Sequence, residues 1–441
     1  MRQRLRRTLV FWQLHGTAEL AKLIARKLRN VLAGQPLFNS LPHDQTLPSL
    51  DSARKRGEAR SVIDIVDARF PALRPIKTFA GPASGRRISL ITDSISQGSL
   101  FGGVGTALIL ASEMANRLDA RLRIITRTEK APPSNVEHVL KVYGLELRQE
   151  PQFLFASIHD RLQEVELLPD EVFLTTSWWT TAATLPAVPH ENILYLLQED
   201  ERMFYPHGDD RLLCESVLAR TDIRFLVNTE LLFDHLVGSG LPNIATQGSW
   251  FEPAFPPAVF RPRPVGNPGK RRFFFYARPN NLRNLYFLGI QVIERAVNLG
   301  VLEPGEWEIC LVGKDIPAVA FGGVPAVRME NLSWSEYAEL IGGVDLGLCL
   351  MATPHPSYPP LDLAASGAVV VTNRFGNKQD LSSYSANILC ADCTVDALVD
   401  GLREGVALSR SPARHENFSR NGLLQDWPRA FRPFLESLSQ P

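Results

Sequence analysis

The sequence has little cysteine, no net charge and no apolar run long enough to cross a bilayer. Five of its 441 residues are cysteines, and such an odd, sparse count is typical of a reducing cytoplasm. The 47 basic residues equal the 47 acidic residues, which excludes the broad basic field of a dedicated nucleic-acid binder. The lack of a long apolar run predicts that no segment spans a membrane.

The chain also lacks three motifs that mark well-known chemistries. It has no GxSxG, no HExxH and no P-loop sequence. Cys390 and Cys393 form one CxxC, but no second pair stands at zinc spacing, so zinc or redox chemistry has little support. Cys310 and Cys349 stand inside apolar runs and are expected to be buried side chains.

What the sequence does contain is a regular alternation of apolar, strand-like runs and helical patterns. In the first series, strands are expected at residues 87–93, 122–126, 172–177, 193–198 and 223–228, with a helix at 104–118. In the second series, strands are expected at 272–277, 307–312, 346–351 and 368–372, with helices at 282–299, 333–342, 360–365, 395–408 and 427–438. This alternation is typical of parallel sheets covered by helices on both faces, so the expected fold class is α/β.

The two series predict two domains. A stretch rich in proline and glycine favours a linker at 256–270 between a first domain at 86–255 and a second at 271–425. Residues 1–85 are expected to form a basic helical extension and a connector, and residues 426–441 a last helix. Ligands of such folds bind outside the carboxyl ends of the strands. The candidate chemistry is therefore expected where strands end.

The first 33 residues are strongly basic, with eight Arg or Lys and a single acid, Glu19. Apolar side chains recur at helical spacing from Leu20 to Val31, and the apolar run at 9–14 is short for a signal peptide. Two interpretations stay open: a basic helix packed on the protein's own surface, or one that lies on an anionic membrane face.

Two arginines form the clearest candidate binding site. Arg278 ends the aromatic strand expected at 272–277, and Arg283 follows five residues later at the start of a helical pattern. A helix N-terminus carries partial positive charge, and each guanidinium presents a planar fork that matches phosphate oxygens. The pair therefore predicts a diphosphate ligand, and the simplest one is a nucleotide sugar.

Glycines follow two further strands. Gly102 and Gly103 come after the first strand, where they either let the backbone approach a ligand closely or form an ordinary turn. Their spacing is not the dinucleotide fingerprint, and no acid ends the second strand, so a nicotinamide enzyme is disfavoured. Gly313 ends another strand, and Lys314 after it either reaches a base or phosphate or is solvated.

The segment 355–367, HPSYPPLDLAASG, predicts a helix that begins at two prolines, because a missing N–H costs nothing there. Asp362 falls in the first turn, where the helix dipole favours its charge. Its carboxylate either accepts hydrogen bonds from ribose hydroxyls or caps the helix. The residues expected to contact substrate from this segment are His355, Ser357, Tyr358, Leu361 and Asp362.

An acidic loop follows the strand expected at 193–198. Its acids are Glu199, Asp200, Glu201, Asp209 and Asp210, and its aromatic residues include Phe204 and Tyr205. The acids either bind a metal ion, or position sugar hydroxyls while the rings stack on a sugar face, or are solvated. Trp178 and Trp179 follow another strand and either line an acceptor site or belong to the core.

Four segments carry a resemblance to a known family: SLFGGVGTAL, LLQEDERMFYP, FFFYARPNNLRN and HPSYPPLDLAASGAVVVTN. Residues 87–438 resemble the GT-B glycosyltransferases of family 4, and within them are most similar to the WsaF-type rhamnosyltransferases of bacterial surface-glycan assembly. The resemblance implies two Rossmann-like domains that face a cleft. The first would bind the acceptor and the second the nucleotide-sugar donor, and the last helix would cross back to the first domain.

The resemblance also implies roles for single residues. Arg278 and Arg283 would bind the donor diphosphate and act in catalysis, because they would stabilise charge that builds on the leaving group. Gly102 and Gly103 would lie near the donor phosphate and the reacting sugar. The sequence itself shows no nucleophile, and Asp200 is the residue expected to orient or deprotonate the acceptor.

One position departs from the family pattern. The family has two glutamates separated by seven residues, and the second falls on Asp362, which would bind the nucleotide ribose. The first falls on Pro354, which offers no polar group to the donor sugar. His355, Ser357 and Tyr358 are the local residues expected to replace it.

The expected activity is transfer of a deoxyhexose, in first place L-rhamnose from dTDP-L-rhamnose, to a hydroxyl of a bacterial surface glycan. The resemblance implies retention of configuration, and neither a metal nor a cofactor is expected. Glu199, Tyr205, Gly313 and Lys314 complete the expected substrate contacts. Two other functions stay open: a nucleotide-sugar 2-epimerase, and a degenerate protein that binds a nucleotide sugar without catalysis. The expected location is the cytoplasm, with or without peripheral contact with the inner membrane through residues 1–33.

Overall fold

The computed structural model describes residues 61–438, apart from 82–84, 96–101, 161 and 263–268. The basic segment 1–33 and most of the expected connector lie outside the described residues, so the predictions for them stay predictions. In the part of the chain that is described, no helix combines the length and the apolar character that a membrane crossing requires.

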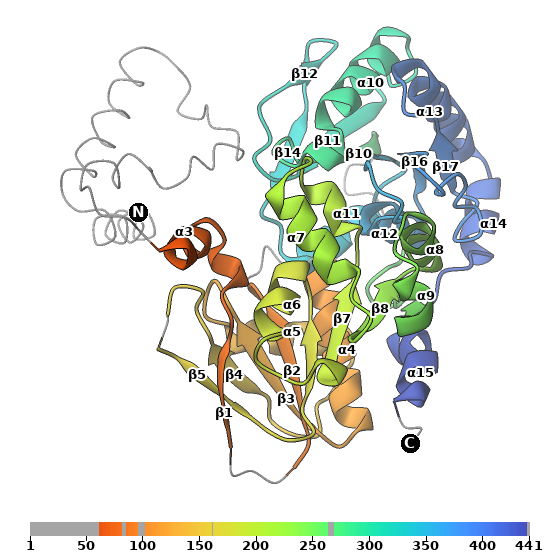
Figure 1. Cartoon of the computed structure of the whole chain (residues 1–441). Helices are drawn as coiled ribbons and strands as arrows, with labels where there is room; N and C mark the ends of the chain where they lie inside the picture. The colour runs from red at the N-terminus through yellow and green to blue at the C-terminus, as the bar shows by residue number, and fades with distance from the viewer. Residues whose placement is uncertain (1–60, 82–84, 96–101, 161, 263–268, 439–441) are drawn as a thin grey trace, which may run out of the picture. The chain divides into compact units, whose positions relative to one another are not determined.

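Within the described residues, the first half forms a sheet of seven parallel strands in the order β4-β3-β2-β6-β7-β8-β9 (Figure 1). The strands are β2 (Arg87–Thr92), β3 (Arg121–Thr126), β4 (Gln152–Phe155), β6 (Val172–Thr175), β7 (Ile193–Leu197), β8 (Arg224–Asn228) and β9 (Gly248–Phe251). All five strands expected from the sequence are present, with ends that differ by one or two residues. The edge strands β4 and β9 were not expected, because each is only four residues long and has at most one buried position.

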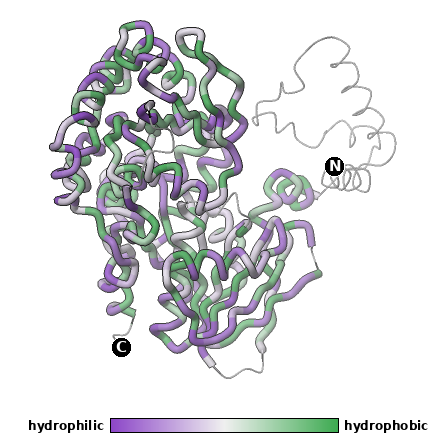
Figure 2. The backbone as a smooth tube through the Cα atoms, turned by 180° about the vertical axis from the view of Figure 1, so that it is seen from behind, coloured by the Kyte–Doolittle hydropathy of each residue, from purple (hydrophilic) through white to green (hydrophobic). Residues whose placement is uncertain are grey.

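Helices cover both faces of this sheet. One face packs on α4 (Gly103–Arg117), α5 (Pro133–Val142) and α15 (Trp427–Ser437), and the other on α6 (Trp178–Thr184), α7 (Asp209–Leu218), α8 (Glu230–Gly238) and α9 (Asn243–Gln247). Side chains alternate along each strand, so Leu90 of β2 joins the first cluster and Ile91 the second. Figure 2 shows hydrophobic stretches along these strands.

A small parallel sheet widens the first half, where β1 (Lys77–Ala80) pairs with β5 (Glu164–Leu167). α3 (Val62–Arg69) precedes it, and Arg69 forms an ion pair of 2.6 Å with Asp210 of α7. The sequence assigns β1 to the connector at 1–85, whereas the structure pairs it with a strand of the first half. Three of its four residues are exposed and one is partly buried, which explains why no strand was expected there.

The second half repeats the architecture with a described sheet of six parallel strands in the order β14-β11-β10-β15-β16-β17. They are β10 (Arg271–Ala277), β11 (Trp307–Gly313), β14 (Val327–Glu330), β15 (Leu346–Cys349), β16 (Val369–Asn373) and β17 (Ile388–Ala391). The helices are α10 (Tyr286–Asn298), α11 (Trp334–Gly342), α12 (Tyr358–Ala365), α13 (Val395–Arg410) and α14 (Ala413–Ser419), and a short hairpin joins β12 (Ala320–Phe321) to β13 (Val324–Pro325). The four expected strands are present, and the unexpected β14 and β17 are again edge strands.

One helix begins later than its sequence pattern predicts. The pattern places a helix at 282–299, but residues 282–284 form the short 3₁₀ turn η5 (Leu282–Asn284). Leu285 then adopts a left-handed conformation with φ 49°, and α10 begins only at Tyr286. Arg283 therefore lies in a turn before the helix and not at the helix N-terminus.

The chain passes between the halves through residues 252–262 and returns to the first half at its end. Within residues 252–262, the only regular pairing is a bridge between Ala254 and Leu424, and Phe255 and Phe260 are buried in the second half's core. Helix α15 then packs on α4 and β9, where Phe431 lies 4.8 Å from Phe251 between ring centres. Both halves thus direct the carboxyl ends of their strands to a shared site.

Candidate functional site

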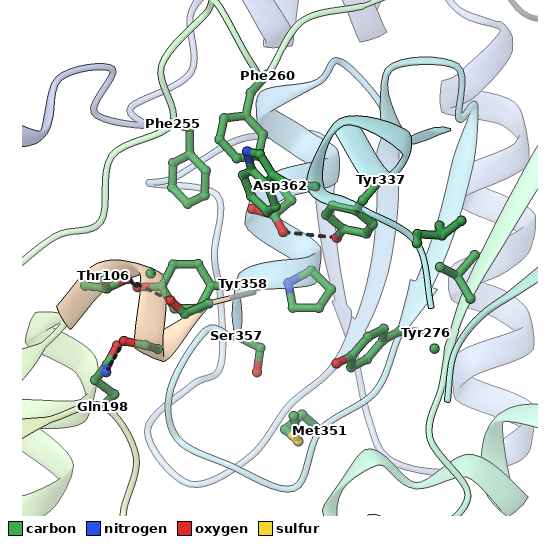
Figure 3. A pocket seen from close by; sticks show the side chains of 18 of the residues that line it. Thr106, Gln198, Phe255, Phe260, Tyr276, Tyr337, Met351, Ser357, Tyr358 and Asp362 are labelled. Atoms are coloured by element: carbon green, nitrogen blue, oxygen red, sulfur yellow. Dashed lines mark hydrogen bonds between the residues drawn. The ribbon is translucent and has the colours of Figure 1, made fainter. Parts of the chain in front are cut away.

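A cavity of about 600 Å³ lies between the two halves, and loops at the carboxyl ends of both sheets line it (Figure 3). The first half contributes residues that follow β2 and β7, and the second half residues that follow β10, β11 and β15. The lining residues that the sequence predicts are Gly102, Gly103, Glu199, Arg278, Gly313, Lys314, His355, Ser357, Tyr358 and Asp362. The fold therefore brings ten of the residues expected from strand ends to one cavity.

Four other expected residues lie outside this lining. Leu361 is fully buried in the apolar core of the second half, because it occupies the inward face of α12. The hydroxyl of Tyr205 instead accepts a hydrogen bond of 3.0 Å from the indole of Trp178, which is a core residue. Arg283 and Asp200 are bound to other side chains, as described below.

Two glycines are required by the close packing at the site. Gly102 has φ 76°, and a Cβ there would stand 3.3 Å from the ring of Tyr358. At Gly313, a Cβ would stand 1.9 Å from the carbonyl oxygen of Ala277, which no side chain can tolerate. Gly102 thus leaves room for the Tyr358 ring, and Gly313 lets the ends of β10 and β11 lie close together at the cavity.

Tyr358 joins the two halves at the centre of the cavity, as Figure 3 shows. Its hydroxyl lies 2.6 Å from the hydroxyl of Thr106 and accepts a hydrogen bond of 2.8 Å from the amide of Asn228. Burial raises the pKa of Tyr358, so the phenol stays neutral. Nearby, the side-chain amide of Gln198 donates to the carbonyl of Gly103 over 2.8 Å. The two bonds of Tyr358 hold α12 against α4 and the end of β8, and the bond of Gln198 fixes the start of α4.

His355 offers an unused hydrogen-bond donor beside Tyr358. Its Nδ1 accepts a bond of 2.8 Å from the backbone N–H of Ser357, which places the proton of the neutral ring on Nε2. Burial, with a smaller contribution from the neighbouring cations Lys378 and Arg283, lowers the pKa of His355 to about 3. Both His355 Nε2 and the Ser357 hydroxyl are buried without a hydrogen-bond partner in the described residues, so they are available to a ligand.

Positive side chains gather at one end of the cavity. Arg278 makes a single long hydrogen bond in the described residues, from Nη1 to the Tyr276 hydroxyl at 3.5 Å. Lys314 is exposed beside it. Arg283 lies behind Glu199, whose Oε2 is 3.2 Å from its Nη1, and its guanidinium covers the Phe204 ring at 4.3 Å. Phe204, expected to stack on a sugar, therefore supports an arginine instead.

Another part of the cavity is aromatic and holds Asp362. The Tyr337 hydroxyl donates to this carboxyl over 3.0 Å (Figure 3), and burial raises the pKa of Asp362 to about 8. The surrounding rings are Tyr143, Phe255, Phe260, Trp334, Tyr337 and Trp427. Sequence reasoning missed these rings, because Tyr143 and Trp427 come from helical segments of the first half and the chain end, far from any strand end.

Asp200 requires a correction. It lies outside the cavity lining and caps the 3₁₀ turn η4 (Glu201–Phe204). Arg202 donates to both of its oxygens at 2.8 Å, and His235 Nε2 lies 3.1 Å from Oδ2. Burial opposes ionisation, but the bonds from His235 and Arg202 lower the pKa of Asp200 to about 2. Such a carboxylate is a poor base, and we assign it to anchoring the acidic loop.

Two other acids of this loop, Glu201 and Asp210, also have partners in the first half. Glu201 accepts a 2.8 Å bond from the backbone N–H of Trp178, and burial raises its pKa to about 8. Asp209 and Asp210 begin α7. Among the residues that the structure describes, no group of three His, Cys, Asp or Glu side chains is arranged to hold a metal ion.

We expect Asp200→Asn to destabilise the fold by roughly 3 kcal/mol, because it leaves buried Arg202 without its counter-ion. The wild type should also lose stability as the pH falls from about 4 towards 2, where the folded carboxylate takes up its proton, and the variant should not show this loss. Urea unfolding at several pH values measures both effects. Asp222→Asn, which breaks an exposed pair with Arg220, is the control and should cost less than about 1 kcal/mol. An Asp200→Asn protein of unchanged stability would contradict the anchoring role.

Comparison with family models places both halves of the chain in one family. Residues 87–229 match the model described as the N-terminal domain of WsaF, and residues 271–403 match the model described as its C-terminal domain. Together the matches cover more than half of the chain. A curated relative, the O-antigen biosynthesis protein RfbC of Myxococcus xanthus, is 31% identical over 293 residues. That match covers 64% of this chain, which spans only 22% of the relative.

Solved structures share the fold at low sequence identity. WaaG, a glycosyltransferase involved in lipopolysaccharide biosynthesis, matches with a TM-score of 0.54 and 12% identity over 81% of this chain and 100% of its own. Sucrose-phosphate synthase of Thermosynechococcus elongatus matches with a TM-score of 0.53 and 12% identity over 80% of this chain and 98% of its own. HepE of Anabaena, in complex with UDP and glucose, matches with a TM-score of 0.53 and 10% identity over 80% of this chain and 99% of its own.

These likenesses confirm the expected fold class. Two parallel α/β halves, joined by an irregular segment and closed by a returning helix, are the architecture of the GT-B glycosyltransferases. The resemblance inferred from the glycine loop, the acidic loop, the arginine strand and the proline helix is confirmed as well. The chain therefore belongs to the WsaF family and has the GT-B fold.

Proposed function

We propose that this protein is a glycosyltransferase of bacterial surface-glycan or O-antigen biosynthesis, and that its donor is a nucleotide sugar, in first place dTDP-L-rhamnose. The observation that carries the proposal is the cavity between the halves, whose lining holds Arg278 and Lys314 together with Asp362, the candidate for ribose binding. The family match and the O-antigen relative support the surface-glycan role. The donor nucleotide and sugar rest on the sequence resemblance.

The donor would lie along the cavity with its nucleoside at the aromatic end. Asp362 would bind the ribose hydroxyls, and the neighbouring rings offer apolar surface to the base. Arg278 and Lys314 at the other end would meet the diphosphate, with Arg283 behind them. The arginines would stabilise the charge that builds on the leaving diphosphate, at about 3 kcal/mol for each preorganised donor. The proposal therefore needs no metal ion.

The donor sugar would lie between the diphosphate end and the glycine loop of the first half. Pro354 offers it no polar group, but Glu199 from the first half lines this part of the cavity. The hydroxyl of Thr353, the residue before Pro354, donates to the Glu199 carboxylate. Glu199 would thus bring a carboxylate to the sugar from the opposite half, with His355 and Ser357 as further partners.

The acceptor hydroxyl would approach from the first half, and by resemblance the reaction would retain the anomeric configuration. Since Asp200 is engaged by Arg202 and His235, we do not assign it a chemical step. The protein would work in the cytoplasm, and residues 1–33, which lie outside the described residues, would either pack on its own surface or touch the inner membrane.

A calorimetric titration with dTDP, UDP, GDP and NAD in the presence of EDTA tests the donor site. We expect dTDP to bind well ahead of the other three ligands, and dTDP-L-rhamnose to release dTDP when a rhamnan acceptor is added. A preference for UDP or GDP would keep the transferase and discard rhamnose. A changed sugar nucleotide without acceptor would indicate the epimerase, and dTDP binding without turnover a degenerate protein.

A further inference from the structure

Lys378 is a buried ammonium group that the sequence gives no reason to single out. It follows β16 in a tight turn, where its backbone exchanges hydrogen bonds with Phe375 at 2.8 and 3.0 Å. The side chain is 0% exposed, and its Nζ makes one long bond of 3.4 Å to the carbonyl of Met351, a cavity residue labelled in Figure 3. No ion pair joins it to an acid within the described residues. A buried cation without a close counter-ion is costly unless a ligand supplies the charge.

The groups that face Lys378 come from several elements. Glu199 follows β7, His355 precedes α12, and Cys390 and Cys393 lie in and after β17. Glu199 favours the charged form of Lys378, and the charges of Lys378 and Arg283 both lower the pKa of His355. The neutral imidazole adds no charge. Lys378 and Arg283 therefore share Glu199 as their acidic neighbour.

The contact between Glu199 and Arg283 is unlike a finished salt bridge. Oε2 stands 3.2 Å from Nη1, yet Nη1 is buried and makes no hydrogen bond in the described part of the chain. A guanidinium that binds a carboxylate well usually forms two parallel hydrogen bonds. The donor group of Arg283 is thus attracted by the carboxylate but still available to another acceptor.

The charges of this site do not balance. Arg278 lines the cavity, whereas Arg283 and Lys378 lie outside its lining and face Glu199. The one other carboxyl of the described lining is Asp362, whose pKa burial raises to about 8. The surplus positive charge fits an anion with more than one negative charge. A diphosphate has that charge and several acceptor oxygens.

We propose that Lys378 is a third cation of the diphosphate site, and that the Glu199 carboxylate holds the place of a phosphate group until the donor arrives. The proposal rests on the proposed nucleotide-sugar function. The diphosphate would bind Arg283 in place of Glu199 and would pair with the ammonium group of Lys378. Glu199, released from Arg283, would then be available to the sugar hydroxyls. No covalent step is involved.

Titration of variants with dTDP and with inorganic pyrophosphate tests this assignment. Lys378→Met should weaken the binding of both ligands roughly tenfold or more, because a charge-assisted contact is lost. Lys378→Arg, which keeps the charge, should restore most of the affinity. Glu199→Gln should bind both ligands several-fold more tightly than the wild type, because the competing carboxylate has lost its charge. If Lys378 and Glu199 only stabilised the fold, their substitution would not change the ligand affinity in opposite directions.

The pH dependence of dTDP affinity tests the same assignment independently in the unmodified protein. Burial lowers the pKa of Lys378 to about 8, so its charge is present below that pH and lost above it. Affinity for dTDP should therefore fall as the pH rises from 7 through 9, where the diphosphate is already fully ionised. The decline should be absent in Lys378→Arg, since an arginine stays charged.

Lys270→Met is the matched control, because Lys270 also donates to a backbone carbonyl, that of Pro304 at 2.8 Å, away from the cavity. It should bind like the wild type. Equal affinity of Lys378→Met and the wild type would overturn the proposal, as would weaker binding by Glu199→Gln. If Lys378→Met fails to fold, the pH profiles of the wild type and Lys378→Arg decide. A wild type that binds neither dTDP nor pyrophosphate would instead refute the proposed function.

Discussion

Replacing Arg278 with alanine is expected to slow sugar transfer roughly 100- to 1000-fold, the usual effect of removing one preorganised donor to a developing anion. Arg278 follows the buried strand β10, lines the cavity and makes only one long contact in the described residues, with Tyr276. Its donors are therefore available to a leaving diphosphate without breaking another bond. Initial rates with saturating donor and acceptor measure the effect, and kcat should fall more than the affinity for dTDP.

Two variants make this result specific. Arg278→Lys keeps the charge but loses the planar fork, so it should recover only part of the rate. Arg272→Ala removes an arginine from the same strand, where it pairs with Glu308 at 3.1 Å outside the cavity. It should leave transfer close to that of the wild type. Full turnover by Arg278→Ala would exclude the diphosphate end of the cavity as proposed here.

The fold could be predicted from the sequence wherever strands are buried on both faces. β2 and β16 are buried at every position, and such strands carry apolar residues on both of their faces. An edge strand such as β14 could not be found, because it is partly exposed to solvent and its polar residues Arg328 and Glu330 interrupt the apolar run. The start of α10 was also wrong, since no sequence rule indicates that Leu285 takes a left-handed conformation that interrupts the helical pattern.

The candidate site could be predicted only as far as backbone position determines it. Arg278, Gly313 and Asp362 follow or adjoin strand ends, so the topology alone brings them to the cavity. The direction of a side chain in a loop depends on its neighbours, which is why Asp200 is drawn to Arg202 and away from the cavity. Lys378 was missed for a related reason. Its segment, NRFGNKQD, has the composition of a solvated loop, and only the packing of the turn buries its amine.

Asp362→Asn is expected to make the protein more stable and a weaker donor binder. The folded carboxyl of Asp362 keeps its proton up to about pH 8, whereas in the unfolded chain it would release the proton near pH 4. Between these values the folded state binds more protons, so the stability of the wild type falls as the pH rises. Asparagine has no proton to lose, and its amide oxygen still accepts the bond from Tyr337. The free energy of unfolding should rise by a few kcal/mol at pH 8, and by much less at pH 5.

The opposite change is expected in donor binding, because one oxygen of Asp362 already accepts from Tyr337 and the other is replaced by an amide nitrogen, which cannot accept a hydrogen bond from a ribose hydroxyl. The dissociation constant of dTDP should rise roughly tenfold, the scale of one lost hydrogen bond. Asp345→Asn is the matched control: that carboxylate accepts a 2.8 Å bond from Arg414 away from the cavity, so its loss should destabilise the fold and leave dTDP binding unchanged. Denaturant unfolding and calorimetry on the same three proteins separate the two effects. An Asp362→Asn protein that unfolds more easily, or binds dTDP as tightly as the wild type, would show that this carboxyl serves the fold and not the nucleotide.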